Sequence, residues 1–252
     1  TAGSVSATGR YVGGLVGYSR DGSLEAVFST AAVTGRSDVG GLVGEQMSAS
    51  IKRSFSTGFV SGLTGYSSGS STVSDSYWAA DVSGQARSSG AIGALLRELR
   101  CSTAADDSAC ADMDLFVGWA DSVDEAGNPY WVFGEDNQLP GLSLNGVVHH
   151  DSDGDGTMDE DDDFPFDYAA FLDSDGDGAL DFWTRDCEVD CQQASDLVLD
   201  QFPLDPATSI DRDLDGSPDE WNEGCDSACQ EASDLTLDPY PNDVDNDGIP
   251  DH

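Results

Sequence analysis

Four short segments carry aspartate at alternate positions, with glycine directly after the third aspartate. Counted from the first aspartate, each has Asp at positions 1, 3, 5 and 9 and Gly at position 6. The segments are DSDGDGTMD at 151–159, DSDGDGALD at 173–181, DRDLDGSPD at 211–219 and DVDNDGIPD at 243–251. Alternate side chains converge on one point, and the glycine permits a sharp turn around a hard cation. Calcium, which takes about six to eight oxygen ligands, fits better than magnesium, which keeps several waters.

The expected ligands are the carboxylates at positions 1, 3, 5 and 9 and the backbone carbonyl at position 7. The first loop supplies Asp151, Asp153, Asp155, Thr157 and Asp159, and the second Asp173, Asp175, Asp177, Ala179 and Asp181. The third supplies Asp211, Asp213, Asp215, Ser217 and Asp219, and the fourth Asp243, Asp245, Asp247, Ile249 and Asp251. The sequence therefore predicts at least four Ca²⁺ sites.

The charge of the chain points the same way. The whole sequence carries a formal net charge of −39, and residues 151–252 hold 33 acidic and two basic residues. Such a segment cannot stay compact without counter-charge, so it is either disordered or held together by cations. The regular spacing of Gly and Asp favours cations. The same charge argues against nucleic acid as a partner, because phosphate would be repelled.

The first half of the chain is built from glycine-punctuated repeats. YVGGLVG at 11–17 returns as DVGGLVG at 38–44, and SLEAVFSTAAVTG at 23–35 returns as SIKRSFSTGFVSG at 50–62, both with the same offset. A third copy, STVSDSYWAADVSG, covers 71–84. Repeats of this length are typical of a solenoid, in which each copy buries its apolar side against its neighbours. We expect strands at Leu24–Phe28 and its copies, with Leu15, Val16, Leu42, Val43 and Leu63 directed inward.

These repeats resemble the GLUG motif family, named for its Gly-Leu-any-Gly signature. The matching segments are Gly14-Leu15-Val16-Gly17, Gly41-Leu42-Val43-Gly44 and Gly62-Leu63-Thr64-Gly65. SYWAADVSGQ at 76–85, Gly118-Trp119, Trp131 and Leu139-Pro140-Gly141-Leu142 are similar to the segment that closes such arrays. The resemblance implies a parallel β-solenoid at 1–146 with a closing cap at about 85–146. It also implies a large bacterial surface protein, such as an adhesin.

The Asp loops resemble thrombospondin type 3 repeats. That pattern adds Asp at position 12, followed by an aromatic residue and proline, as in Asp162 and Phe164-Pro165. Thr184 and Asn222 stand at position 12 of the second and third loops, but Asp200 and Asp238 precede similar Phe-Pro and Tyr-Pro pairs. In the first loop, position 9 and the next aligned aspartate, Asp159 and Asp162, lie close together in the sequence. The spacing is much longer, and equal, from Asp181 to Asp200 and from Asp219 to Asp238. Insertions of equal length in the second and third loops account for this longer spacing. Asp162, Asp200 and Asp238 are therefore expected as further ligands.

Six cysteines form three close pairs, Cys101/Cys110, Cys187/Cys191 and Cys225/Cys229. Local pairs in an even number predict disulfides and an oxidising compartment. The last two pairs lie in the inserted segments, for which we expect short disulfide-bonded helical hairpins with a small core of Trp and Leu. The alternative is a thiolate metal site, which the lack of a nearby histidine disfavours.

The sequence thus predicts a mainly β chain, with the solenoid at 1–146 and an irregular calcium-stabilised rod at 147–252. The expected function is an extracellular, calcium-binding structural or adhesive segment of the cell surface, with host-surface, matrix or self-association ligands. The alternatives are an accessory region of a secreted metallopeptidase or other hydrolase, and a subunit of an extracellular filament. No HExxH motif and no apolar stretch of transmembrane length is visible, so no enzyme is expected, and the missing leader indicates a fragment. Calcium removal is expected to open the second half and to leave residues 1–146 largely intact.

Overall fold

The computed structural model of the chain describes residues 2–59, 62–83, 88–101, 115–133, 138–185, 187–245 and 247. It is mainly β and divides into two compact units, Thr1–Phe166 and Asp167–His252. The division falls after the first Asp loop, whereas the sequence placed the domain boundary between 146 and 147. The first Asp loop thus belongs to the same compact unit as the repeats.

The described residues of the first unit form short strands and two short helices. Its strands are β1 (Ser4–Ser6), β2 (Arg10–Gly13), β3 (Val16–Arg20), β4 (Ser23–Glu25), β5 (Phe28–Ser29), β6 (Ala32–Thr34), β7 (Ser37–Gly40), β8 (Val43–Met47), β9 (Ser50–Lys52), β10 (Phe55–Ser56), β11 (Thr64–Ser68), β12 (Thr72–Ser74), β13 (Tyr77–Ala79), β14 (Ile92–Ala94), β15 (Trp131–Val132), β16 (Gly141–Leu144) and β17 (Val147–His149). Its helices are α1 (Leu96–Leu99) and the 3₁₀ helix η1 (Asp159–Asp161).

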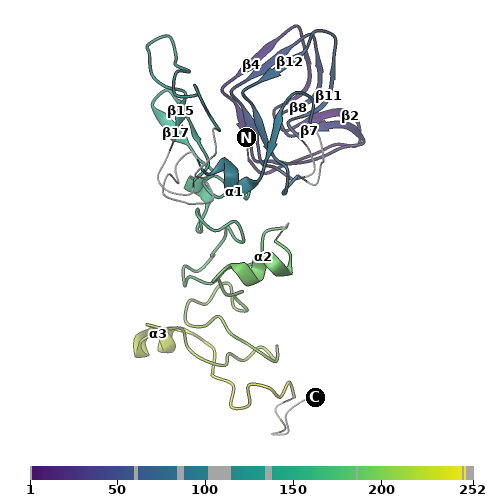
Figure 1. The fold of residues 1–252 in the computed structure, drawn as a ribbon. Coiled ribbons are helices and arrows are strands. Elements are labelled where there is room, and N and C mark those ends of the chain that lie inside the picture. The colour runs from purple at the N-terminus through teal and green to yellow at the C-terminus, as the bar shows by residue number, and fades with distance from the viewer. Residues whose placement is uncertain are drawn as a thin grey trace. The chain divides into compact units, whose positions relative to one another are not determined.

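Equivalent strands of successive copies pair in parallel (Figure 1). The three-stranded sheets run in the orders β11-β8-β3 and β12-β9-β4, and a four-stranded sheet runs β14-β13-β10-β5. Val16 pairs with Val43 and Val43 with Thr64, while Leu24 pairs with Ile51 and Ile51 with Val73. The repeat seen in the sequence is thus the repeat of the strand register. Short parallel strands of this kind gain their stability from the neighbouring copies, because each alone buries too little apolar surface.

The backbone turns sharply between these strands at residues with positive φ. Leu24–Phe28 was predicted as one strand; it is broken between β4 and β5 by Ala26, whose φ is +52°. The copies break at the equivalent Arg53 and Asp75, which also have positive φ. The glycine pair at Gly40-Gly41 instead permits close approach, since a Cβ on Gly40 would lie 2.0 Å from the Val43 carbonyl oxygen.

The core of the stack consists of the repeated apolar positions. Leu42, Val43 and Leu63 are fully buried, as the sequence predicted, and cluster with Ile51 and Trp78. Leu15 departs from the prediction and is 38% exposed. The Leu42 carbonyl accepts the Leu15 amide, and the Leu63 carbonyl accepts the Leu42 amide. Among the described residues, Leu42 therefore has a copy on each side, whereas Leu15 has one on a single side.

A second apolar layer is aromatic and involves residues from beyond the repeats. The rings of Phe28 and Phe55 stack at 5.3 Å, and Trp131 packs against both, at 6.4 and 5.6 Å. Trp119 lies 4.6 Å from Trp131, and its indole nitrogen donates to the Asp75 carbonyl. The segment predicted to close the array thus reaches back along the β5-β10-β13 sheet to the first copy. Its strands β15, β16 and β17 are antiparallel.

The second unit has little regular structure. Among its described residues the helices are α2 (Val189–Ala194) and α3 (Ser227–Ala232), and each insertion shows one short helix there rather than the expected hairpin. Leu180 is fully buried, but Trp183 and Trp221 are only partly buried, and the expected Trp and Leu core is therefore weak. Among the helices of the described residues, none has the length and apolarity that a membrane span needs.

Candidate metal centres

Each of the four predicted loops brings three carboxylates together. In each case one oxygen from each of the aspartates at positions 1, 3 and 5 lies within 4.8 Å of the other two. The groups are Asp151/Asp153/Asp155, Asp173/Asp175/Asp177, Asp211/Asp213/Asp215 and Asp243/Asp245/Asp247. Three like charges at this separation repel one another strongly. The loops therefore need a source of positive charge, a bound proton, or both.

The backbone of each of the first three loops fixes the position 1 carboxylate through both of its oxygens. In the first loop Asp151 accepts the Gly154 amide at 2.7 Å and the Gly156 amide at 3.1 Å. Asp173 in the second loop accepts the amides of Gly176 and Gly178 in the same way. Asp211 does so in the third. This arrangement depends only on residues within one loop, which is why it recurs.

Within their own loop, the position 3 and position 5 carboxylates accept a backbone amide through one oxygen each. Asp153 accepts the Asp155 amide through Oδ1 at 3.0 Å, and Asp155 accepts the Thr157 amide at 2.7 Å. The other oxygens, Oδ2 of Asp153 and Asp155, are buried without a hydrogen-bond donor, and the same holds for Oδ2 of Asp175. A buried carboxylate oxygen without a donor is costly, and a cation within the triplet would satisfy it. The donor set is all oxygen, which suits a hard cation.

The position 9 aspartates of the first three loops are bonded to position 2 of their own loops. Asp159 accepts both the amide and the hydroxyl of Ser152 at 2.7 Å, and Asp181 accepts the same two groups of Ser174. Asp219 is paired with Arg212. Among the described residues, the carboxylate triplets that could hold a metal ion do not include Asp159, Asp181 or Asp219. The loop is thus closed by position 2 binding position 9. In the fourth loop Ile249 and Asp251 lie outside the described residues.

The delayed aspartates return to the loops. Asp200 donates its amide to the Leu180 carbonyl at 2.8 Å, and Asp238 donates to Pro218 at the same distance. Both are nearly buried, and Oδ2 of each has no donor. The other oxygen of each accepts the amide two residues on at 2.7 Å, as Oδ1 of Asp162 does.

The insertions therefore loop out between two ends that stay close together. Leu180 and Leu199 form a parallel bridge across the base of the first insertion. The charges of Asp175, Asp177 and Asp181 all act on Asp200. Asp162 acts likewise on Asp153 and Asp155 in the first loop. The first and second loops thus each have a further carboxylate beside the triplet, and Asp238 returns to the third loop in the same way.

Burial perturbs several of these groups. It raises the pKa of Asp153 from 3.8 to about 9, with the neighbouring charges of Asp155 and Asp151 adding to the effect. Burial likewise raises the pKa of Asp155 to about 8 and of Asp151 to about 6. The pKa of Asp175 and of Asp200 rises to about 6 for the same reason. The charged carboxylates are thus disfavoured where the fold places them, and most so in the first loop.

Three contacts to the loops were not visible from the sequence. The hydroxyl of Ser209 and the side-chain amide of Asn222 both donate to Oδ2 of Asp177, at 2.7 and 2.5 Å. Asn222 stands at position 12 of the third loop, where the repeat pattern has aspartate, and its side chain binds a carboxylate of the second loop. The Asp243 amide donates to Oδ2 of Asp213 at 2.7 Å, so the fourth loop contacts the third. No spacing rule predicts such contacts between loops.

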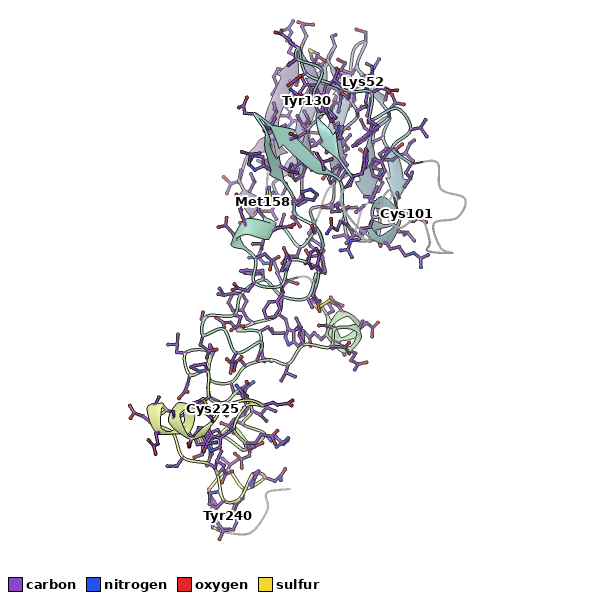
Figure 2. The ribbon with its side chains drawn as sticks, turned by 90° about the vertical axis from the view of Figure 1, so that its left-hand side faces the viewer. Lys52, Cys101, Tyr130, Met158, Cys225 and Tyr240 are labelled. Carbon is purple, nitrogen blue, oxygen red and sulfur yellow. A yellow bond between two sulfur atoms is a disulfide. The ribbon has the colours of Figure 1, made fainter. Side chains whose placement is uncertain are left out.

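The cysteines of both insertions are oxidised. Disulfides join Cys187 to Cys191 and Cys225 to Cys229, as predicted, so the thiolate metal site is excluded at these positions. Each disulfide links the residues just before α2 or α3 to the first turn of that helix. Figure 2 shows Cys225 beside α3. Cys101 is disulfide-bonded as well. Its predicted partner, Cys110, lies outside the described residues, and that pairing stays a prediction.

Comparisons of the chain with protein-family models, with curated proteins and with solved structures find no match. The resemblances to GLUG motifs and thrombospondin type 3 repeats therefore rest on the motifs themselves.

Proposed function

We propose that this chain is an extracellular, calcium-binding structural and adhesive segment of a large bacterial surface protein. In this proposal the four Asp triplets bind Ca²⁺ and the strand repeats form a parallel β-solenoid. The single observation that carries it is the geometry shared by the loops. In each triplet one carboxylate oxygen of each aspartate lies within 4.8 Å of the others, and Oδ2 of Asp153, Asp155 and Asp175 is buried without a donor while Oδ1 accepts a backbone amide.

Calcium suits this donor set better than other common metals. Each triplet supplies three carboxylates, Asp162, Asp200 or Asp238 adds a fourth in the first three loops, and position 7 offers a carbonyl. Such a site approaches the roughly six to eight oxygens that calcium takes at variable distances. Zinc and other softer metals prefer thiolate and imidazole ligands. The cysteines near the second and third loops are in disulfides and cannot supply thiolates.

Calcium would serve as the structural core of the second unit. Among its described apolar side chains, this unit buries little beyond alanines, Leu180 and Cys187, and it carries most of the −39 charge of the chain. Folding of such a chain is coupled to metal binding, because the ligands repel one another without the ion. Extracellular modules bind calcium with dissociation constants of about 10⁻⁴ to 10⁻³ M. The disulfides are compatible with an extracellular location.

The parallel strand register supports the solenoid. Successive copies pair through Val16 and Val43 and, with the same offset, through Leu24 and Ile51. In a solenoid each turn of the chain adds one strand to every sheet, so a constant offset is expected. The adhesive role rests on the resemblance of these repeats to those of bacterial surface proteins.

Calorimetric titration of the whole chain with calcium tests the proposal. We expect at least four sites, no comparable heat from magnesium at the same concentrations, and calcium-dependent protection of the second unit from limited proteolysis. The single variants Asp175→Asn and Asp213→Asn should each remove one site, because each deletes the charge of a position 3 ligand. An isotherm without calcium binding, or a proteolysis pattern that a chelator leaves unchanged, would contradict the proposal.

A further inference from the structure

The first Asp loop differs from the others in its surroundings. Asp151, Ser152 and Asp153 are 2%, 1% and 1% exposed, whereas Asp173 and Asp175 in the second loop are only half-buried. The sequences DSDGDG at 151–156 and 173–178 are identical, so the loop itself cannot cause the difference. The β-strand unit causes it, because the first loop lies within that unit.

Four contacts hold the first loop against the strand repeats and the segment that follows them. The Gly3 amide donates to the Gly156 carbonyl at 2.6 Å, and Gly3 in turn accepts the amide of Ala32 at the start of β6. A side-chain hydrogen bond joins Thr30 to the position 1 carboxylate of Asp151. The remaining two contacts come from beyond the repeats: the Leu139 amide donates to the Ser152 carbonyl, and the Arg100 guanidinium donates to the Asp153 carbonyl.

The glycines of the loops show how closely the first one is packed. A Cβ on Gly154, at position 4, would lie 2.9 Å from Cδ1 of Leu139 and 3.2 Å from Cδ1 of Leu96. Gly176, at position 4 of the second loop, has nothing within 4 Å. In the third loop position 4 is Leu214, which is 69% exposed at a φ of +63°. The loop geometry thus accepts a leucine at position 4, and only the docking of the first loop forbids one.

Docking buries groups that need a ligand. Oδ2 of Asp153 has no hydrogen-bond donor although the residue is 1% exposed, and one carboxylate oxygen of Asp153 lies within 4.8 Å of oxygens of Asp151 and Asp155. Oγ1 of Thr57, beside Gly154 in the same contact, is likewise buried without a partner. Leaving a carboxylate unpaired at such a position is strongly unfavourable. The first loop has two such oxygens, on Asp153 and Asp155, whereas the second loop has one, on the half-buried Asp175. The docked position of the first loop therefore depends on a cation in a way that the second loop does not share.

We propose that the cation of the first loop is a structural component of the β-strand unit, which it stabilises by holding the loop docked against Gly3, Thr30 and Leu139. The inference rests on the proposed calcium binding and goes beyond it, since it gives the first site a separate task. Calcium would then stabilise both units. Its removal is expected to destabilise the β-strand unit as well, in contrast to the expectation from the sequence that residues 1–146 stay largely intact. Thermodynamic linkage sets the size of the effect. At calcium a hundredfold above the dissociation constant, the opening equilibrium of the strands coupled to the loop falls about 100-fold.

Hydrogen exchange on the whole chain, with and without calcium, tests this directly. The reporters are peptides that contain the amides of Val33 and Thr57, which are bonded to Phe59 and Ser29 of neighbouring copies. We expect calcium to slow their exchange about 100-fold under the conditions just given. The variant Gly154→Leu should abolish this slowing because it blocks docking while leaving every carboxylate in place. Gly176→Leu is the matched control, with the same positive φ and open space, and should keep the full effect.

Two further measurements make the outcomes separable. Exchange of Gly154→Leu in chelator should equal that of the unaltered chain in chelator, which shows an intact β unit. If the variant is disrupted even there, Asp153→Asn takes its place and should lose the protection. Unchanged exchange at Val33 and Thr57 while calorimetry shows the first site filled would overturn the inference and leave calcium binding standing. Full protection in Gly154→Leu would also overturn it. A chain that binds no calcium at any loop would instead refute the proposed function.

Discussion

Asp200 offers a sharp test of how the second loop completes its cation site. Its carboxylate comes from beyond an insertion and yet lies beside the triplet, 4% exposed, with Oδ1 bonded to the Phe202 amide and Oδ2 without a donor. The substitution Asp200→Asn keeps the shape and an oxygen to accept the Phe202 amide. It removes one negative charge from the position facing the triplet.

The size of the expected effect follows from the role of that charge. Ligand charge count tunes calcium affinity, and even residues that contact a metal only through its ligands cost about 10- to 100-fold when they are changed. A direct carboxylate ligand should cost at least this much, which corresponds to about 1.4–2.8 kcal/mol. In a calorimetric titration of Asp200→Asn, one site should therefore fill only at calcium concentrations well above those at which the other sites fill.

The structure supplies close controls. Asp196 lies in the same insertion, is exposed, and has its copy in the exposed Asp234 of the second insertion. Asp196→Asn and Asp234→Asn should leave the isotherm unchanged, while Asp238→Asn should weaken one site as Asp200→Asn does. If Asp200→Asn binds calcium like the unaltered chain, Asp200 is no ligand. The view that the chain returns across the insertion to complete the site would then be wrong.

Two more predictions concern protons and sulfur. The pKa values of about 9 for Asp153 and about 8 for Asp155 exceed the 3.8 of an exposed aspartate, so the metal-free folded loop holds protons at pH 7 that the unfolded chain has lost. The metal-free loop thus loses stability as the pH rises from about 4 to about 9, and calcium must displace those protons, about one to two at pH 7. Titrations in buffers of different ionisation enthalpy should reveal this release and a weaker first site at lower pH, whereas heats independent of the buffer would contradict the raised values. Alkylation followed by intact-mass measurement should find no free thiol, and peptide mapping should join Cys101 to Cys110 beside the two disulfides of the insertions. A Cys187–Cys225 link would refute the local pairing.

The sequence alone was sufficient for features that depend on residues close together in the chain. The triplets form within one short loop, through hydrogen bonds such as those from Gly154 and Gly156 to Asp151, so identical letters give identical loops. The disulfides join near neighbours in the sequence, at Cα separations of 5.1 and 5.3 Å. The strand register follows the sequence repeat because equivalent positions of each copy meet the same neighbours.

Features that depend on distant residues could not be obtained in this way. Ala26 and Arg53 adopt positive φ although nothing in their side chains favours it, because the stacked strands impose the corner. The partners of Asp177, which are Ser209 and Asn222, come from much further along the chain, beyond the first insertion.

The first and second Asp loops show the division most clearly. Their first six residues are identical, and the sequence predicts one kind of site for both. The tertiary structure places Gly154 against Leu139 and Leu96 and leaves Gly176 in open space. The chemistry of a loop is local, since its ligands and amides are neighbours along the chain. Its burial, and with it the need for a cation, is set by whatever part of the fold packs against it.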